Sequence, residues 1–297
     1  MSNIANYMNK TDNEYTYKSI VAASYKHNSP AGIAMNNVKP ITAYNVLYNA
    51  RNSDPLSSFG DFMAINTTIT KEMATYITSQ VSDGIIANDY DNEALEILKK
   101  KKKGKYVILK AIDNKHQKYN KQFKDDVEYR ELYGVGLYQE RNDSFENIIQ
   151  KIQEHPDIHL MPLNCTENAI IGTIALNYIP SNSVTFTHNG MVIGIGSGQQ
   201  NRVDCIKIAG EKAMRWWNNH YGDDNYNQYT GTWNIEPDFV MSSDGFLPFE
   251  DNIEIAHKYN VKVIIQPGGS IKDKKIQKEC DKYKIHMIHT GQRLFTH

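Results

Sequence analysis

Residues 181–202 read SNSVTFTHNGMVIGIGSGQQNR, and this stretch decides the fold that we expect. Ser183–Thr187 alternates polar with apolar or aromatic side chains, as a half-buried strand does. Asn189-Gly190 is the dipeptide that best tolerates positive φ at both central positions of a type I′ turn. The apolar segment Met191–Ile195 follows directly. The stretch therefore predicts a β-hairpin.

A glycine-rich turn, GIGSG at residues 194–198, comes next, and an amphipathic helix is predicted to begin near Gln200. Such a turn lets backbone N–H groups approach a ligand, and the helix dipole favours an anion there. A tight β-to-α connection without a ligand has the same pattern, and GxGxG alone does not separate the two. Asn182 and Arg202 bracket the turn with polar groups, which favours a binding site.

Composition excludes several classes of protein. The chain has 297 residues, 40% of them hydrophobic, and a net charge of −1, so one large or two modest domains are expected. No apolar run is long enough to span a membrane, and the N-terminus lacks the apolar core of a secretory signal. Three cysteines without a CxxC pair predict a reduced, cytoplasmic protein without a disulfide framework or zinc site.

The remaining pattern is that of an α/β protein. The last sixty residues alternate strand, helix, strand, helix and strand, which predicts a parallel sheet. We expect one lobe over residues 1–150, a second over residues 151–297, a loosely packed start over residues 1–18 and a polar connection over residues 115–157. Helices are predicted at residues 41–50, 70–81, 93–100, 169–178, 203–217, 250–258 and 271–283. Strands are predicted at residues 19–25, 62–65, 106–111, 160–163, 183–187, 191–195, 239–241, 261–265 and 285–289.

A run of lysines, Lys99–Lys103 with Lys105, follows one predicted helix. Cations at a helix C-terminus complement its dipole, and a solvated connection is the commoner explanation of such a run. No interleaved aromatic residues or second basic stripe accompany it, so we expect no nucleic-acid partner.

Two further groups of residues offer chemistry. Lys26 and His27 are predicted to lie at the end of a strand, before Pro30 and Gly32 stop regular structure. A neighbouring ammonium disfavours imidazolium, so His27 is expected to be neutral and able to accept a proton. Asp244 precedes an apolar patch, where it either orients a heteroaromatic ligand or caps the following helix. The chain has no zinc-deaminase, Walker or nucleophile-elbow motif.

Taken together, these segments resemble the aminoimidazole carboxamide ribonucleotide (AICAR) transformylase family, normally the C-terminal part of a bifunctional purine-synthesis protein. The resemblance spans nearly the whole chain in the family's order. The matching stretches are KHNSPAG (26–32), SSFGDF (57–62), VSDGIIA (81–87), residues 181–202, SDGFLPFEDN (243–252), QPGGSIKD (266–273) and TGQRLFTH (290–297).

The resemblance implies two cytidine-deaminase-like three-layer α/β lobes without zinc, and formyl transfer from 10-formyltetrahydrofolate to the 5-amino group of AICAR. His27 would take the amine proton, Lys26 would assist, and Asn182 would hold the amine in attack geometry. The family is an obligate homodimer with sites at the subunit interface, so a homodimer is implied. The residues implied for the nucleotide site are Gly60, Asp83, Arg202, Phe246 and Arg293, the last near the phosphate.

Two further sets of residues follow from the resemblance. Pro248 and Asp251 would face the pterin of the folate. Ser183, Asp244 and Leu294 would lie near a structural potassium ion.

The chain also departs from the family pattern. We expect no cyclohydrolase domain and no ring closure to inosine monophosphate. Residues 1–18 lack the Arg-Tyr-Gly-x-Asn-Pro-His-Gln-like motif that begins the family's transformylase, and the segment after Trp217 is shorter than the family's dimerisation insert. Another chain supplying the missing segment is one possible partner. The alternative function is that of a non-catalytic nucleotide-binding remnant or partner subunit.

Overall fold

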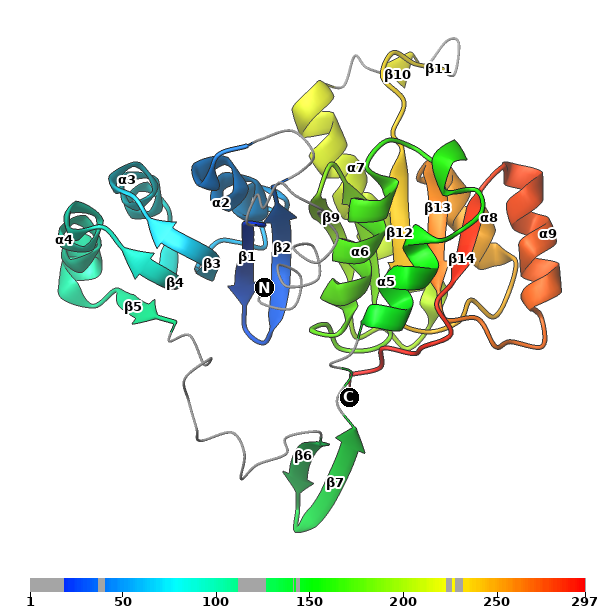
Figure 1. The fold of residues 1–297 in the computed structure, drawn as a ribbon, viewed down its shortest axis with the longest axis horizontal. Coiled ribbons are helices and arrows are strands. Elements are labelled where there is room, and N and C mark those ends of the chain that lie inside the picture. Colours follow the sequence, from blue (N-terminus) through cyan, green and yellow to red (C-terminus); the bar gives the residue numbers. More distant parts are fainter. Residues whose placement is uncertain are drawn as a thin grey trace.

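The computed structural model describes residues 19–36, 41–111, 127–140, 142, 145–222, 226–227 and 232–296. The expected loose start at residues 1–18 lies outside the described residues. A ten-stranded sheet crosses the whole molecule in the order β14-β13-β12-β8-β9-β2-β1-β3-β4-β5 (Figure 1). The expected α/β fold is confirmed: helices cover a large central sheet.

The strands of the large sheet are β1 (Val21–Lys26), β2 (Ser29–Met35), β3 (Asp61–Ile69), β4 (Ser82–Tyr90), β5 (Val107–Lys110), β8 (Val184–His188), β9 (Met191–Gly196), β12 (Phe239–Ser243), β13 (Val261–Gln266) and β14 (His286–His289). Two short hairpins lie outside it: β6 (Val127–Leu132) with β7 (Val135–Glu140), and β10 (Tyr226–Asn227) with β11 (Thr232–Trp233). The helices are α2 (Ala43–Asn52), α3 (Lys71–Ser79), α4 (Asn92–Lys100), α5 (Glu146–Gln153), α6 (Cys165–Leu176), α7 (Arg202–Tyr221), α8 (Asp251–Lys258) and α9 (Asp273–Tyr283).

The two halves of the sheet have the same topology. In the first half, the β1–β2 hairpin is followed by α2, β3, α3, β4, α4 and β5; in the second, the β8–β9 hairpin is followed by α7, β12, α8, β13, α9 and β14. In both halves the third strand (β3 or β12) is antiparallel to the first strand of the hairpin (β1 or β8). The last two strands of each half run parallel to that third strand. Antiparallel pairing of β2 with β9 joins the halves, with Ile33 opposite Val192. The boundary near residue 150 stays a prediction.

Hydrophobic cores form on both faces of the sheet because strand side chains alternate in direction. On one face, buried residues of α2, α3, α4, α7, α8 and α9 pack together with strand residues such as Ala22 and Ile193. On the other face, α5 and α6 pack over strand residues such as Val21 and Val192. Helix α6 is buried almost throughout because it is apolar on all sides.

The stretch 181–202 folds largely as expected. Asn189 (φ 48°) and Gly190 (φ 71°) both adopt the left-handed conformation that a type I′ turn requires between β8 and β9. Gly194 and Gly196 have a packing role, since a Cβ at either position would overlap a main-chain oxygen of α7. Strand β8 is fully buried and not half-buried, because α6 covers the face that its polar residues occupy.

Several local expectations are wrong. Pro30 and Gly32 continue into β2, with Pro30 near the start of the strand, where the missing N–H is tolerated. The helix predicted at residues 70–81 ends at Ser79, and Ser82-Asp83-Gly84 already belongs to β4. The strand predicted at residues 160–163 does not form, because a short 3-10 turn over Ile158–Leu160 ends there and residues 161–163 belong to no strand. The polar connection contains the β6–β7 hairpin, which projects from the sheet, and helix α5 (Figure 1).

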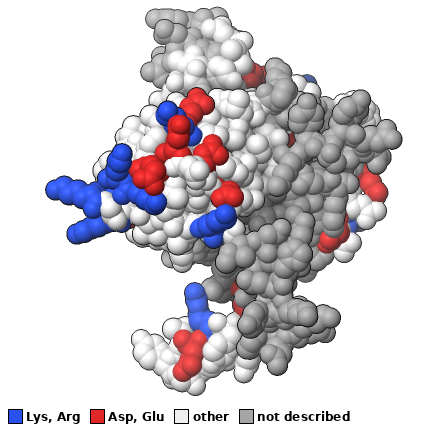
Figure 2. All heavy atoms as spheres, turned by 60° about the vertical axis from the view of Figure 1, so that its left-hand side comes forward, with Lys and Arg blue, Asp and Glu red and all other residues white. Residues whose placement is uncertain are grey.

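The lysine run is part of a surface of mixed charge. Ion pairs join Lys71 to Glu93, Lys99 to Glu96, Lys102 to Asp83 and Lys110 to Asp89. Figure 2 shows basic and acidic side chains interspersed on this side of the molecule. Interspersed charges of both signs weaken the positive field that attracts nucleic acid. None of the helices in the described part of the chain has both the length and the apolar character needed to span a bilayer.

The close packing of α7 on β9 predicts that Gly196→Ala destabilises the protein. The added methyl group would overlap the Cys205 main-chain oxygen, and overpacking of this kind costs about 1–3 kcal/mol. Urea unfolding measures this loss. Lys207→Ala is the matched control, because Lys207 is an exposed residue of α7 and such changes stay within about 0.5 kcal/mol. Equal stabilities of the Gly196→Ala and Lys207→Ala variants would contradict the packing.

Burial also predicts unreactive cysteines. Desolvation raises the pKa of Cys165, Cys205 and Cys280 to about 12 in each case, so the thiolate is scarce below that pH. An aromatic disulfide reagent at pH 8 should label none of the three in the folded protein and all of them in denaturant. Rapid labelling of the native protein would show that one of the thiols is accessible.

Candidate functional site

Two pockets lie side by side at one end of the large sheet. The first, called here the arginine pocket, has a volume of about 690 Å³. The second, called here the lysine pocket, has a volume of about 350 Å³. They flank the two sides of the glycine-rich turn, because Ser197 lines the lysine pocket and Gln200 lines the arginine pocket.

Strand direction explains why the predicted residues gather at this end. Antiparallel pairing places the end of β1, the start of β2, the end of β9, the start of β8 and the end of β12 along a single edge. The starts of β3 and β4 and the ends of β13 and β14 lie along the same edge. The residues that sequence reasoning selected therefore occupy one edge of one sheet, although they come from distant parts of the chain.

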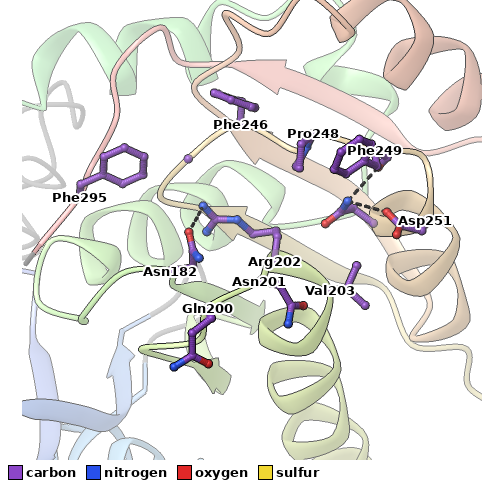
Figure 3. Close-up of a pocket in the computed structure, with 12 residues that line it drawn as sticks. Asn182, Gln200, Asn201, Arg202, Val203, Phe246, Pro248, Phe249, Asp251 and Phe295 are labelled. Carbon is purple, nitrogen blue, oxygen red and sulfur yellow. Dashed lines mark hydrogen bonds between the residues drawn. The ribbon is translucent and has the colours of Figure 1, made fainter.

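The arginine pocket is lined by polar residues on one side and aromatic residues on the other (Figure 3). Asn182 precedes β8, and Arg202 is the first residue of α7, whose N-cap is Asn201. The aromatic side comes from the loop after β12 and from the C-terminal segment. Its lining residues are Asn182, Gln200, Asn201, Arg202, Val203, Gly245, Phe246, Pro248, Phe249, Asp251, Asn252 and Phe295.

A buried ion pair orients the polar side of this pocket. Arg202 and Asp244 form a close salt bridge, and their side chains are 7% and 0% exposed. Arg202 Nη1 also donates to the Ser183 carbonyl oxygen (3.1 Å), and Nη2 donates to Asn182 Oδ1 (2.9 Å). The other carboxylate oxygen of Asp244 accepts from the Ser183 N–H (3.0 Å). The Asn182 side chain is thereby fixed, with its Nδ2 donating to the Gln199 carbonyl oxygen (2.8 Å).

The alternative role for Asp244, a helix cap, is wrong, because its carboxylate binds Arg202 and Ser183 and lies before the loop that precedes α8. Gly245 follows it in a tight place, where a Cβ would lie 2.7 Å from Arg202 Nη2.

The aromatic side of the pocket carries a second arginine. The guanidinium carbon of Arg293 lies 5.5 Å from the ring centroid of Phe246 and 5.9 Å from that of Phe295. Such cation–π contacts hold a guanidinium beside an apolar surface. The planar ring of Phe246, which lines the pocket, can stack with a heteroaromatic ligand.

Pro248 and Asp251 line the same pocket at the start of α8. Asn252 Nδ2 donates to Asp251 Oδ1 (2.8 Å) and to the Phe249 carbonyl oxygen (2.9 Å). Asn252 is 1% exposed, and its Oδ1 is buried without a hydrogen-bond partner. These two hydrogen bonds fix the Asn252 amide beside Asp251 at the pocket lining.

Lys26 and His27 lie in the lysine pocket, at the turn between β1 and β2. His27 adopts a left-handed conformation (φ 57°), and its side chain is exposed. The Lys26 ammonium donates to the Phe59 carbonyl oxygen (2.5 Å) in the loop before β3. Catalytic groups often occupy such uncommon backbone conformations at turns. The expected neutral state of His27 stays a prediction.

Along the sheet, Lys26 and His27 lie between Asn182 on one side and Gly60 and Asp83 on the other. Gly60 precedes β3 with φ 79°, and Asp83, near the start of β4, pairs with Lys102. Strands are about 4.8 Å apart, so the eight steps from β4 to β14 span about 38 Å. One chain therefore brings Asn182, Arg202, Phe246, Pro248, Asp251 and Arg293 together around the arginine pocket. Lys26 and His27 line the adjacent lysine pocket, and Gly60 and Asp83, which line neither pocket, lie beyond it at the starts of β3 and β4.

The residues expected near potassium do come together. Ser183 and Asp244 are hydrogen-bonded, and the Leu294 N–H donates to the Asp244 carbonyl oxygen (3.0 Å). Both carboxylate oxygens of Asp244 are engaged, and Arg202 already supplies a positive charge. The carboxylate therefore does not fit a cation, whereas the buried Ser183 Oγ has no hydrogen-bond partner. In the described part of the chain, no three His, Cys, Asp or Glu side chains gather as a metal site.

Sequence reasoning missed residues that only the fold brings to the pockets. In the lysine pocket these are chiefly Ser57, Ser197 and Lys212, and in the arginine pocket Asn252 and Phe295. All of these residues except Lys212 fall within stretches already matched to the family. Lys212 had no local signal, because its partners Asp54 and Ser57 lie in the other half of the sheet.

Comparison with known proteins agrees with this picture. The family described as AICARFT/IMPCHase bienzyme matches residues 2–212. The bifunctional purine biosynthesis protein PurH of Persephonella marina is 31% identical over 92% of this chain and 47% of its own length. The PurH proteins of Clostridioides difficile and Prochlorococcus marinus are each 32% identical over 94% of this chain and 48% of their own.

Among solved structures, a dCMP deaminase from the cyanophage S-TIM5 aligns with 35% of this chain and 90% of its own, with a TM-score of 0.29 and 12% identity. So low a score carries no argument, and the cytidine-deaminase-like character of the lobes stays a prediction. The chain spans about half the length of the curated relatives it matches. With a family match over residues 2–212 and relatives 31–32% identical over more than nine-tenths of the chain, this protein belongs to the AICARFT/IMPCHase bienzyme family.

Proposed function

We propose that this protein transfers a formyl group from 10-formyltetrahydrofolate to the 5-amino group of AICAR, in the cytoplasmic synthesis of purines. The observation that carries the proposal is the buried Arg202–Asp244 pair, which aims Asn182 into a pocket with an aromatic wall. The chain's resemblance to AICAR transformylase and its membership of the family support it.

The arginine pocket suits a planar, phosphorylated ligand. The base of AICAR would stack near Phe246, and the Asn182 amide would hold its carboxamide and amine. Arg293, already beside Phe246, would lie near the phosphate. Pro248 and Asp251 would face the pterin of the folate from the start of α8. Fixed polar groups of this kind lower the barrier by orienting the two reactants.

The chemical step is then an attack of the amine nitrogen on the formyl carbon. The carbonyl electron pair moves to oxygen, and His27 accepts the proton from the amine. When the electron pair on oxygen re-forms the carbonyl, the bond between the formyl carbon and the folate nitrogen breaks, and His27 delivers its proton to that nitrogen. The Lys26 ammonium would stabilise the developing oxyanion. General base catalysis by His27 would contribute about 10²- to 10⁴-fold in rate.

Two subunits would complete the site. Within one chain, Lys26 and His27 line a different pocket from Asn182 and Arg202, and Gly60 and Asp83 line neither. We propose a homodimer in which the lysine pocket of one subunit faces the arginine pocket of its partner, as the resemblance to the family implies. A potassium ion near Ser183, Asp244 and Leu294 is implied by the resemblance alone, because the Asp244 carboxylate is already engaged by Arg202 and Ser183.

His27→Ala should abolish formyl transfer while AICAR affinity is retained. The variant removes the proton acceptor, so kcat is expected to fall by about 10²- to 10⁴-fold. A folate-absorbance assay with purified chain, AICAR and 10-formyltetrahydrofolate measures kcat, and calorimetry measures AICAR binding. Cyclohydrolase activity is followed in parallel.

His159→Ala is the matched control, because His159 is an exposed histidine outside both pockets. Turnover by His27→Ala at the wild-type rate would show that the catalytic assignment is wrong. Binding of AICAR without turnover by the wild-type chain would favour the alternative, a nucleotide-binding remnant.

A further inference from the structure

The lysine pocket has the chemical character of an anion site. Its polar lining residues are two lysines, one histidine and three serines. No acidic residue is among the described residues that line it. The full lining is Lys26, His27, Ser29, Pro30, Ala31, Ser57, Ile195, Ser197 and Lys212.

Lys212 reaches this pocket from α7 because a buried carboxylate holds it. Its Nζ lies 3.0 Å from Asp54 Oδ2, and the two side chains are 27% and 2% exposed. Asp54 also accepts from the Ser57 hydroxyl (2.6 Å) and main-chain N–H (3.2 Å). This network links the two halves of the sheet, since Asp54 and Ser57 follow α2 and Lys212 belongs to α7.

The Asp54 carboxylate is ionised at neutral pH. Burial by itself raises its pKa, but hydrogen bonds from Ser57 and the charge of Lys212 outweigh that effect and lower it. A second cation, Arg215, lies one turn further along α7, with its Nη2 3.3 Å from Asp54 Oδ1. Asp54 thus faces two cations, and the cluster with Lys26 keeps a net positive charge.

We propose that the lysine pocket binds an oxyanion, a phosphate or carboxylate group, with Lys212 as a direct ligand beside Lys26. The ammonium groups and serine hydroxyls supply hydrogen-bond donors, and Asp54 lies behind Lys212, away from the pocket lining. The anion site deepens the proposed function. It rests on that function in one respect, because the proposed reaction decides which substrate would carry the phosphate or carboxylate group. In a folate-dependent transfer to a ribonucleotide, the source is a phosphate monoester or a glutamate-type carboxylate.

Lys212 and Arg215 form a matched pair for the test. Both bind Asp54, but only Lys212 lines the pocket. We would titrate the full chain with inorganic phosphate and follow the His27 ring signals by NMR, assigned with His27→Gln. Lys212→Met should weaken phosphate binding by at least about tenfold, whereas Arg215→Met should change it by less than about twofold.

Lys212→Arg keeps the charge, so its affinity for phosphate should be closer to that of the wild type than the affinity of Lys212→Met is. This variant shows whether a loss in Lys212→Met comes from the missing charge or from a failure to fold. Absence of a saturable shift in wild type, or equal losses in Lys212→Met and Arg215→Met, would overturn the proposal. The second of these results would indicate general electrostatic attraction only.

Two further probes distinguish the source of the group. Ribose 5-phosphate offers a phosphate monoester, N-(4-aminobenzoyl)glutamate offers carboxylates, and ribose is the neutral control. If either anion binds and Lys212→Met weakens that binding, the anion site is supported and the anion that binds identifies the source of the group. If ribose binds as tightly as both anions, the proposal is overturned. Formyl transfer is measured separately, so phosphate binding without turnover would contradict the proposed function and leave the anion site standing.

Discussion

The candidate site depends on one buried ion pair, between Arg202 and Asp244. Arg202 begins α7, and Asp244 follows β12, so the pair fixes a helix to a strand end. The pair also hydrogen-bonds to Asn182 and to the main chain of Ser183. Breaking the pair would leave a buried charge without a partner, which costs free energy of folding. The second half of the sheet is therefore most stable when the pair, and with it the shape of the pocket, is intact.

The duplicated architecture gives the site its two parts. Each half of the sheet consists of a hairpin and three further strands, and the halves meet where β2 pairs with β9. The lysine pocket forms at this junction, where the network of Asp54, Ser57 and Lys212 crosses from one half to the other. The arginine pocket belongs to the second half. A division of this kind suits a reaction with two large substrates.

Local patterns predicted much of this fold, and the errors have physical causes. The Asn189-Gly190 turn and the α/β alternation after residue 239 follow from short-range rules and are confirmed. Pro30 was misread because a strand's start tolerates proline. Asn182 and Arg202 were identifiable because they bracket one glycine-rich turn. Lys212 was not, since its partner Asp54 is brought to it only by the pairing of the two halves.

The most direct measurement is a double-mutant cycle on the ion pair, using Arg202→Met, Asp244→Asn and the double variant, with free energies of unfolding from urea titrations. If the buried pair holds the pocket together, each single change costs about 3–5 kcal/mol, and the double change costs much less than their sum. Losses that add within about 0.5 kcal/mol would contradict the account, because they would show that the two side chains act independently.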